Sequence, residues 1–519
     1  MLLHQPTKSL LIKHPDPWAV REVLPHSKTL DHPDYNLAVH LTVESSKVLR
    51  NMGLEAPAPI RFFYNWPGKF KPFAHQIVMA EFLTLHRRAF NLSEMGSAKT
   101  NASLWAADWL MQTGRVDKAL VLSPLSTLER VWANDIFDTL MHRSCAIVHG
   151  TREKRMAALA ADVDFYIMNH DGLGIADLVD HIHKRPDINL IIVDEASMFR
   201  NASTRKFKAL ERLCKRHDIR LWLMTGTPCP NDPTDAWALA KLVSPDRVPK
   251  FFGAFKRATM MQISQFKWVP RADAYAVAFE AMQPAVRFKK ADCIDLPPVT
   301  IQDRQCAMTP EQRKAFEDLK KTMVAEAKAG KEIKAVNAAD QIGKLRQILC
   351  GAIKVGDDDY QALDHKPRLE VLTEAIDQAS AKVLIVAPFK GIVRSLETEL
   401  VSQGYSVGVL NGDVPPKERD RIIREFKTQA DPHILLCHPK VMSHGLNLTE
   451  ADTLIFYAPI YSNDEYQQVT ERFNRAGQKN KMTIIRMAAH PLEWEIYRLL
   501  GNRQANQTSI LNLYKVVTE

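Results

Sequence analysis

The chain has 519 residues, of which 46% are hydrophobic and 25% charged, as in an ordinary folded protein of about three domains at roughly 100–200 residues each. This composition excludes a chain that is mainly disordered, collagenous or coiled coil, and no apolar run of about 18 residues predicts a membrane span. The seven dispersed cysteines include no CxxC pair, which favours a cytoplasmic protein over a disulfide framework or a zinc knuckle. The net charge of +9 is compatible with a polyanionic partner.

The first half of the chain alternates short apolar runs with segments of helical character. We predict strands in the runs at residues 118–124, 163–170, 188–197 and 219–228. Continuous apolar strands separated by helices indicate a parallel sheet that is covered on both faces, and ligands bind at the carboxyl ends of such strands. Residues 71–245 are therefore predicted to form one α/β lobe, preceded by a segment, residues 1–70, whose structure the pattern does not define.

A candidate phosphate-binding loop, SEMGSAKT at residues 93–100, follows an apolar stretch and opens a predicted helix. Backbone N–H groups at a helix N-terminus bind phosphate, Lys99 would neutralise the terminal phosphates, and Thr100 would bind Mg²⁺. Ser93 and Ala98 stand where the pattern GxxxxGK[ST] has glycine, so the motif alone leaves an ordinary strand–turn–helix equally open. The alanine matters only if the backbone there needs a positive φ. The residues expected to contact the nucleotide are Ser93, Glu94, Met95, Gly96, Ser97, Ala98, Lys99 and Thr100.

Two adjacent acids, Asp194 and Glu195, end the apolar run of residues 188–193. Such a pair is costly inside a core unless it meets a cation or solvent. We predict that Asp194 holds Mg²⁺ and that Glu195 orients or deprotonates the attacking water. The alternative, an acidic helix N-cap, is disfavoured once the loop at residues 93–100 is also considered.

The alternating pattern returns near the C-terminus, after a charged and helical stretch. Arg472 and Arg475 lie three residues apart, on one face of a predicted helix, and could stabilise transition-state charge on the γ-phosphate as arginine fingers do. A solvated basic helix is the alternative for an isolated RxxR. We predict a helical insertion at residues 246–375, a second α/β lobe at residues 376–519, and strands at residues 382–388, 405–413, 433–439, 452–459 and 482–489.

Taken in order, these motifs resemble the superfamily-two helicases, and most closely the Swi/Snf-type DNA-translocating ATPases. The resemblance runs from about residue 70 to residue 497 and implies two RecA-like parallel-sheet lobes in tandem, with a helical insertion between them. KPFAHQ at residues 71–76 resembles the adenine-reading Q motif, which assigns Gln76 to the base, and DEAS resembles a DEAH-type box. The resemblance assigns the coupling of ATP to nucleic acid to Ser123, Pro124, Thr225, Gly226, Thr227, Gly445 and Asn447.

The resemblance implies a nucleic-acid-dependent ATPase that uses ATP and Mg²⁺ to track along or remodel double-stranded or forked DNA. The size looks like that of a stand-alone bacterial or bacteriophage member, acting in the cytoplasm of a bacterial or phage-infected cell. Two alternatives remain open at this point: a strand-separating DNA or RNA helicase, and a weakly hydrolysing ATP-gated clamp on DNA. Proteins of replication, recombination or transcription are the expected partners, whereas pathway, polarity and oligomeric state are not defined by the sequence.

Overall fold

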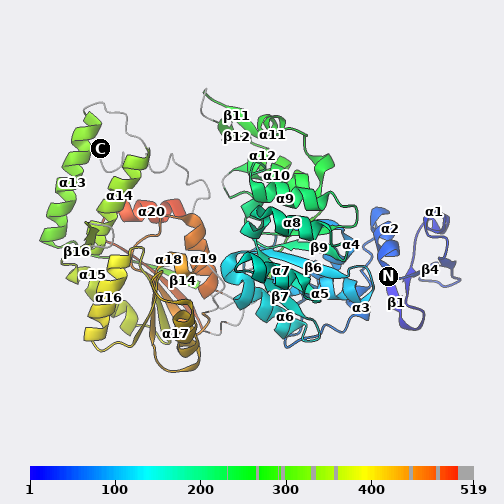
Figure 1. The fold of residues 1–519 in the computed structure, drawn as a ribbon, viewed down its shortest axis with the longest axis horizontal. Helices are drawn as coiled ribbons and strands as arrows, with labels where there is room; N and C mark the ends of the chain where they lie inside the picture. The colour runs from blue at the N-terminus through cyan, green and yellow to red at the C-terminus, as the bar shows by residue number, and fades with distance from the viewer. Residues whose placement is uncertain are drawn as a thin grey trace. The chain divides into compact units, whose positions relative to one another are not determined.

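The computed structural model describes residues 1–230, 232–264, 268–289, 292–293, 299–328, 335–355, 360–442, 448–474, 478 and 480–500. The chain divides into two units, Met1–Cys293 and Ile294–Glu519. Each unit contains a large parallel sheet with helices on both faces (Figure 1). Among the described residues, no helix combines the length and the apolar character that a membrane span requires.

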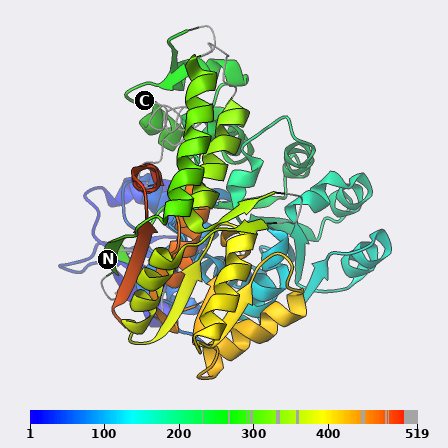
Figure 2. The same ribbon diagram turned by 90° about the vertical axis from the view of Figure 1, so that its left-hand side faces the viewer.

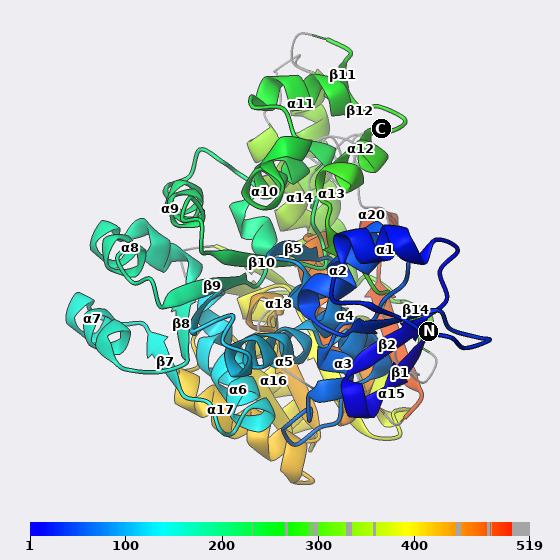
Figure 3. The same cartoon turned by 90° about the vertical axis from the view of Figure 1, so that its right-hand side faces the viewer.

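The N-terminal segment that the sequence left undefined forms a small α+β subdomain of unit 1 (Figure 3). Its antiparallel sheet has the order β1-β2-β4-β3, and a separate cluster of buried side chains, including Leu10, Ile12, Leu37 and Val39, packs beneath it. The bounds of its elements are β1 (Leu2–His4), β2 (Ser9–Ile12), α1 (Pro17–Val23), β3 (Lys28–Thr29), β4 (Leu37–His40) and α2 (Val43–Asn51).

The main sheet of unit 1 has seven parallel strands in the order β13-β5-β10-β9-β6-β8-β7. Alternate residues of its central strands enter two different buried clusters, so each face of the sheet has a core. The four predicted strands are confirmed as β6 (Lys118–Ser123), β8 (Phe165–Asn169), β9 (Ile188–Val193) and β10 (Arg220–Met224). The other strands are β5 (Arg88–Asn91), which precedes the candidate phosphate loop, and two that were not predicted, β7 (Cys145–Val148) and β13 (Ala285–Val286).

Helices cover both faces of this sheet, and a short hairpin lies beyond it (Figures 1 and 3). Helix α5 begins at Lys99, directly after the candidate phosphate loop, as the sequence predicts. The bounds are α3 (Ile60–Phe63), α4 (Ala74–Leu85), α5 (Lys99–Gln112), α6 (Asn134–Thr139), α7 (Arg152–Ala160), α8 (Ala176–His183), α9 (Arg205–Cys214), α10 (Ala236–Val243), α11 (Phe252–Thr259), β11 (Met260–Gln262), β12 (Trp268–Pro270) and α12 (Ala274–Ala281).

Unit 2 repeats the architecture with six parallel strands in the order β14-β21-β20-β17-β19-β18. The five predicted strands are confirmed, and the edge strand β14 was not predicted. The two α/β lobes expected from the sequence are therefore present. The bounds are β14 (Val299–Gln305), β17 (Lys382–Val386), β18 (Val407–Leu410), β19 (Ile434–Cys437), β20 (Ala451–Phe456) and β21 (Met482–Ala488).

The residues predicted as a helical insertion, 246–375, are divided between the units. Helices α11 and α12 belong to unit 1, whereas β14 and the long neighbouring helices α13 and α14 belong to unit 2 (Figure 2). The remaining elements of unit 2 are α13 (Pro310–Lys328), α14 (Ala335–Cys350), β15 (Ala352–Lys354), β16 (Tyr360–Ala362), α15 (Lys366–Asp377), α16 (Lys390–Ser402), α17 (Pro416–Thr428), α18 (Pro439–Met442), α19 (Asn463–Phe473) and α20 (Pro491–Leu500).

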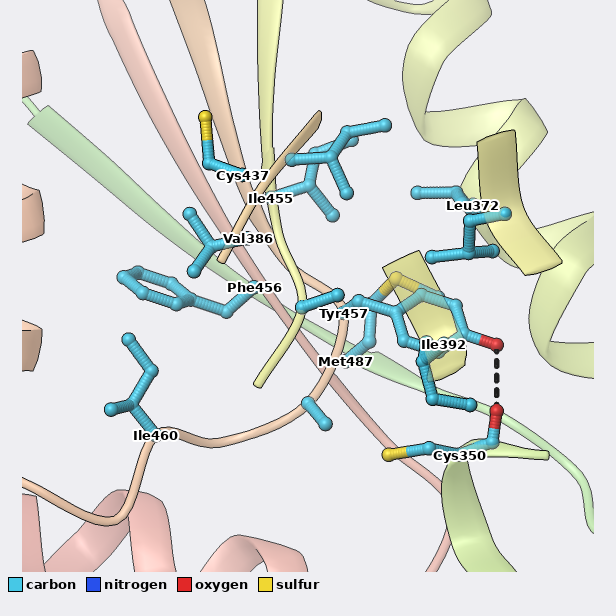
Figure 4. Close-up of a cluster of buried hydrophobic side chains, with 14 of the residues drawn as sticks. Cys350, Leu372, Val386, Ile392, Cys437, Ile455, Phe456, Tyr457, Ile460 and Met487 are labelled. Carbon is cyan, nitrogen blue, oxygen red and sulfur yellow. Dashed lines mark hydrogen bonds between the residues drawn. The ribbon is translucent and has the colours of Figure 1, made fainter. Parts of the chain in front are cut away.

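The core of unit 2 joins the sheet to these inserted helices. Val386, Cys437 and Phe456 at the ends of neighbouring strands are fully buried, and the Tyr457 hydroxyl donates a hydrogen bond to the carbonyl oxygen of Cys350 at 3.3 Å (Figure 4). Because Cys350 is the last residue of α14, this buried hydrogen bond holds the C-terminus of that helix against the carboxyl end of β20.

Candidate functional site

The loop of residues 93–100 connects β5 to the N-terminus of α5. Its lysine folds back into the loop: the Lys99 Nζ donates to the carbonyl oxygens of Ser93 at 2.8 Å and Glu94 at 3.1 Å. The ammonium group therefore lies among the backbone groups of the turn, at the positive end of a 14-residue helix. This is the arrangement of backbone N–H groups and a cation that suits a phosphate chain.

Ala98 occupies the left-handed region of backbone space, with φ +55° and ψ +44°, directly before α5. Residue 98 therefore has the positive φ at which alanine is less favourable than glycine. A Cβ in this region costs about 1–2 kcal/mol relative to glycine, so alanine strains the loop at the residue where related phosphate loops have glycine.

We expect Ala98→Gly to raise the free energy of unfolding of unit 1 by about 1 kcal/mol, because the substitution removes this strain. Urea denaturation measures the change. Ala157→Gly, in the exposed middle of α7, is the control and should lower the same free energy by about 0.5–1 kcal/mol. Equal losses in both variants would contradict the assignment of strain to Ala98.

Two neighbouring residues at the N-terminus of α4 form hydrogen bonds with the phosphate loop. The Gln76 side chain accepts from the Phe73 backbone N–H at 2.9 Å and donates to the Ala98 carbonyl oxygen at 3.1 Å. His75 lies 3.0 Å from the Ser97 carbonyl oxygen through its Nε2. Burial lowers the pKa of His75, so the neutral ring carries its proton on Nε2 and donates it to Ser97. Gln76 was predicted to read the base; His75 was not predicted, although it stands beside Gln76 in the same motif.

Ser93 faces the segment after β13. Its buried Oγ accepts from the Phe288 backbone N–H at 3.1 Å, and the Glu94 N–H donates to the Phe288 carbonyl oxygen at 3.0 Å. These two bonds continue the pairing of β13 with β5 along the loop. Ser93 therefore ties the start of the phosphate loop to a residue 195 positions away in sequence, which the loop motif could not reveal.

The acid pair follows β9, and its backbone is also unusual. Asp194 accepts hydrogen bonds from the Trp132 indole N–H at 3.1 Å and from the Glu195 backbone N–H at 3.0 Å. Glu195 has φ +48°, a conformation that bulky residues adopt where surrounding structure imposes it, often at functional sites. The His170 ring, whose pKa burial lowers, donates to the Asp194 carbonyl oxygen at 2.8 Å. Trp132 and His170 were missed by sequence reasoning, since neither stands near the acids in the chain.

The predicted coupling loop after β10 packs on the phosphate loop. Strand β10 lies between β5 and β9, so the carboxyl ends of the three strands bring residues 93–100, 194–195 and 225–227 to one edge of the sheet. The Thr225 N–H donates to the Asn91 carbonyl oxygen at 3.1 Å, and the Thr227 N–H donates to the Thr225 hydroxyl at 3.2 Å. A Cβ added to Gly226 would lie 3.1 Å from the Met95 backbone nitrogen, so the two loops are in close contact at that position.

The remaining predicted residues lie further along the sheet or in unit 2. Ser123 ends β6 and precedes the half-buried Pro124; within the described chain its buried hydroxyl has no hydrogen-bond partner. Arg472 lies half-buried in the last turn of α19. Arg475, Gly445 and Asn447 fall outside the described residues. Unit 1 thus brings residues 93–100, 194–195 and 225–227 together, and the roles of all the predicted residues, in both units, stay predictions.

The chain is similar in sequence to bacterial and phage proteins. A Mycoplasma genitalium protein named an uncharacterized ATP-dependent helicase is 23% identical over 79% of this chain, which spans only 39% of that relative. Protein p41 of Acyrthosiphon pisum secondary endosymbiont phage 1 is 24% identical over 79% of this chain and 90% of its own length. A solved structure, the Sulfolobus solfataricus SWI2/SNF2 ATPase core in complex with dsDNA, is 20% identical with a TM-score of 0.40, covering 87% of this chain and 96% of that one.

Family models match both units. The helicase conserved C-terminal domain matches residues 367–477. The SNF2-related domain matches residues 79–352, more than half of the chain. These matches agree with the order of motifs and with the two parallel-sheet lobes, and the chain belongs to the SNF2-related family.

Proposed function

We propose that this protein is a nucleic-acid-dependent ATPase that converts ATP hydrolysis into movement along double-stranded DNA, in the cytoplasm of a bacterial or phage-infected cell. The observation that carries the proposal is the contact between the phosphate loop and the coupling loop at Met95 and Gly226. A change at the phosphates would be transmitted through this contact, because the two loops pack closely at these two residues. Family membership supports the same conclusion.

The residues at the sheet edge fit the nucleotide and its metal. The N–H groups at the start of α5 and the Lys99 ammonium would bind the β- and γ-phosphates. The Thr100 hydroxyl and the Asp194 carboxylate are hard oxygen ligands of the kind Mg²⁺ prefers, and one or two such ligands suffice where substrate phosphates complete the coordination. Asp194 has capacity for this, since a carboxylate offers about four lone-pair sites and Trp132 and Glu195 use one on each oxygen. Bound Mg²⁺ would neutralise charge on the transferring phosphoryl group.

Hydrolysis would then depend mainly on positioning and on charge. Glu195 would orient the attacking water, and its backbone has the positive φ that residues at functional sites often adopt. Lys99 would stabilise the charge that develops on the γ-phosphate. Arg472 and Arg475 are proposed as arginine fingers, a role that the family resemblance implies for the RxxR sequence.

Coupling to DNA would run through contacts with phosphate. We assign these contacts to Ser123, whose buried hydroxyl has no hydrogen-bond partner in the described chain, and to Thr225 and Thr227 on the loop that contacts Met95. Gly445 and Asn447 are proposed to contribute from unit 2. Contacts to phosphates carry no sequence information, so we expect binding that is tolerant of sequence and weakens steeply with salt.

Displacement of a third strand tests this function. A translocase that tracks duplex DNA should release a triplex-forming oligonucleotide from a duplex in an ATP-dependent manner, because it removes obstacles without separating the duplex. Glu195→Gln is the control that should bind DNA without release. Forked DNA and RNA duplexes, tested in parallel, should stay paired. Strand separation of either fork without triplex release would assign a helicase, and ATP-dependent DNA retention with neither activity would assign a clamp.

A further inference from the structure

One part of unit 1 that the proposed motor does not use carries exposed aromatic side chains. Helix α11, the hairpin β11–β12 and helix α12 pack on one another and lie together at one end of unit 1 in two perpendicular views (Figures 1 and 3). We name residues 250–264 and 268–281 the aromatic arm. Its exposed large apolar side chains in the described residues are Phe251, Phe252, Met261, Ile263, Tyr275 and Phe279.

Helix α12 buries its small apolar residues and exposes two large ones, the reverse of the usual arrangement. Ala274, Ala278 and Ala281 face the core and are buried, whereas Tyr275 and Phe279 are 50% and 40% exposed. Burial of large apolar side chains is what drives folding, so a helix that buries alanine and exposes rings is not arranged for stability alone. Because residues four apart lie on one helix face, the two rings form a continuous surface.

Positive charge lies beside two other rings of the arm, those of Phe251 and Trp268. Phe251 is 71% exposed, and the Lys250 Nζ lies 5.7 Å from the centre of its ring. Arg257 is exposed on α11, and the Lys256 Nζ lies 4.3 Å from the centre of the Trp268 ring on β12. Protein–protein interfaces are depleted in lysine, whereas aromatic rings beside cations are the surface that single-stranded nucleic acids bind, through base stacking and phosphate contacts.

We propose that the aromatic arm binds an unpaired nucleic-acid strand, with bases stacked on Phe251, Tyr275 and Phe279 and phosphates close to Lys250 and Arg257. A duplex does not fit this surface as well, because the faces of its bases are covered by their neighbours. The arm follows the coupling loop in the chain and ends at β13, whose extension bonds to the phosphate loop. An unpaired strand at a DNA fork would therefore be held by a segment that lies in the chain between the coupling loop and β13.

Binding measured without ATP tests the arm separately from the proposed motor. We expect the double variant Tyr275→Ala/Phe279→Ala to bind labelled oligothymidylate about tenfold or more weakly than wild type, since each stacked base contributes a factor of about 5 to 150. Its affinity for blunt duplex should be unchanged, and Tyr275→Phe should bind like wild type because the ring remains. Phe137→Ala, which removes a 69% exposed ring from α6, is the matched control and should have no effect. Fluorescence anisotropy measures all four proteins.

The strand's position gives a second readout. A photoreactive 5-iododeoxyuridine strand should crosslink to peptides from residues 250–281. The proposal is overturned if the double variant binds oligothymidylate like wild type, if Phe137→Ala weakens binding equally, or if crosslinks map elsewhere. It is also overturned if the double variant leaves DNA binding unchanged and abolishes a concentration-dependent dimer in sedimentation, since the face would then bind a second copy. Failure of ATP hydrolysis or translocation would leave these results intact, because neither is needed for them.

Discussion

Lys99→Ala should reduce DNA-stimulated ATP hydrolysis by at least about 100-fold, the scale seen when a group that stabilises transition-state charge is removed. In the structure the Lys99 ammonium lies against the backbone of the phosphate loop, and no other lysine or arginine stands among residues 93–100. Steady-state phosphate release measures the loss.

Lys208→Ala is the matched control, because Lys208 is an exposed lysine on α9 of the same unit. This variant should hydrolyse ATP like wild type. The fold of the Lys99→Ala variant can be verified by urea denaturation. A well-folded variant that retains the wild-type rate would remove Lys99 from the catalytic site.

Glu493→Gln should lower the free energy of unfolding of unit 2 by about 3–5 kcal/mol, the usual cost of breaking a buried ion pair. Arg368 on α15 and Glu493 on α20 are 1% and 0% exposed, and the Arg368 Nη2 donates to both carboxylate oxygens, at 2.7 and 2.8 Å. The same carboxylate accepts from the Ala489 backbone N–H at 2.7 Å. Neutralising it leaves the guanidinium charged and buried.

Urea denaturation measures this change in the free energy of unfolding, with hydrogen exchange of the amides in β20 and α20 as the probe of unit 2. Glu495→Gln is the matched control, since Glu495 lies on the same helix and pairs with the exposed Arg498, and its free energy of unfolding should stay close to the wild-type value. A double substitution, Arg368→Met with Glu493→Leu, should recover much of the loss because it removes both charges. Equal stability of Glu493→Gln and Glu495→Gln would contradict the account.

The strands of both lobes could be predicted because their signal is local. A strand buried on both faces contains a continuous apolar run, as in residues 190–193 and 434–437, and this run can be recognised without knowing which strands lie beside it. The edge strand β14 was missed for the converse reason. Its sequence, VTIQDRQ, is largely polar and half exposed, and only its pairing with β21 makes it part of the sheet.

The motifs of the candidate site could be predicted for the same reason, because their signal is local in the sequence. Lys99, Asp194 and Glu195 stand in short motifs, and strand order brings their loops to one edge. The residues that hold those loops come from elsewhere in the chain: Phe288 bonds to Ser93, and Trp132 bonds to Asp194. Such partners follow from the folded backbone, as does the positive φ that makes Ala98 a strained residue.

Steady-state ATP hydrolysis without nucleic acid and with single-stranded DNA, blunt duplex, forked DNA or RNA tests the central proposal most directly. We predict strong stimulation by blunt and forked duplex DNA that Lys99→Ala abolishes. Stimulation by RNA alone would contradict a DNA motor and assign the protein to RNA. Binding of ATP without hydrolysis on any nucleic acid would contradict the motor altogether and indicate a nucleotide-gated clamp, with Ala98→Gly as the first variant to test for restored turnover.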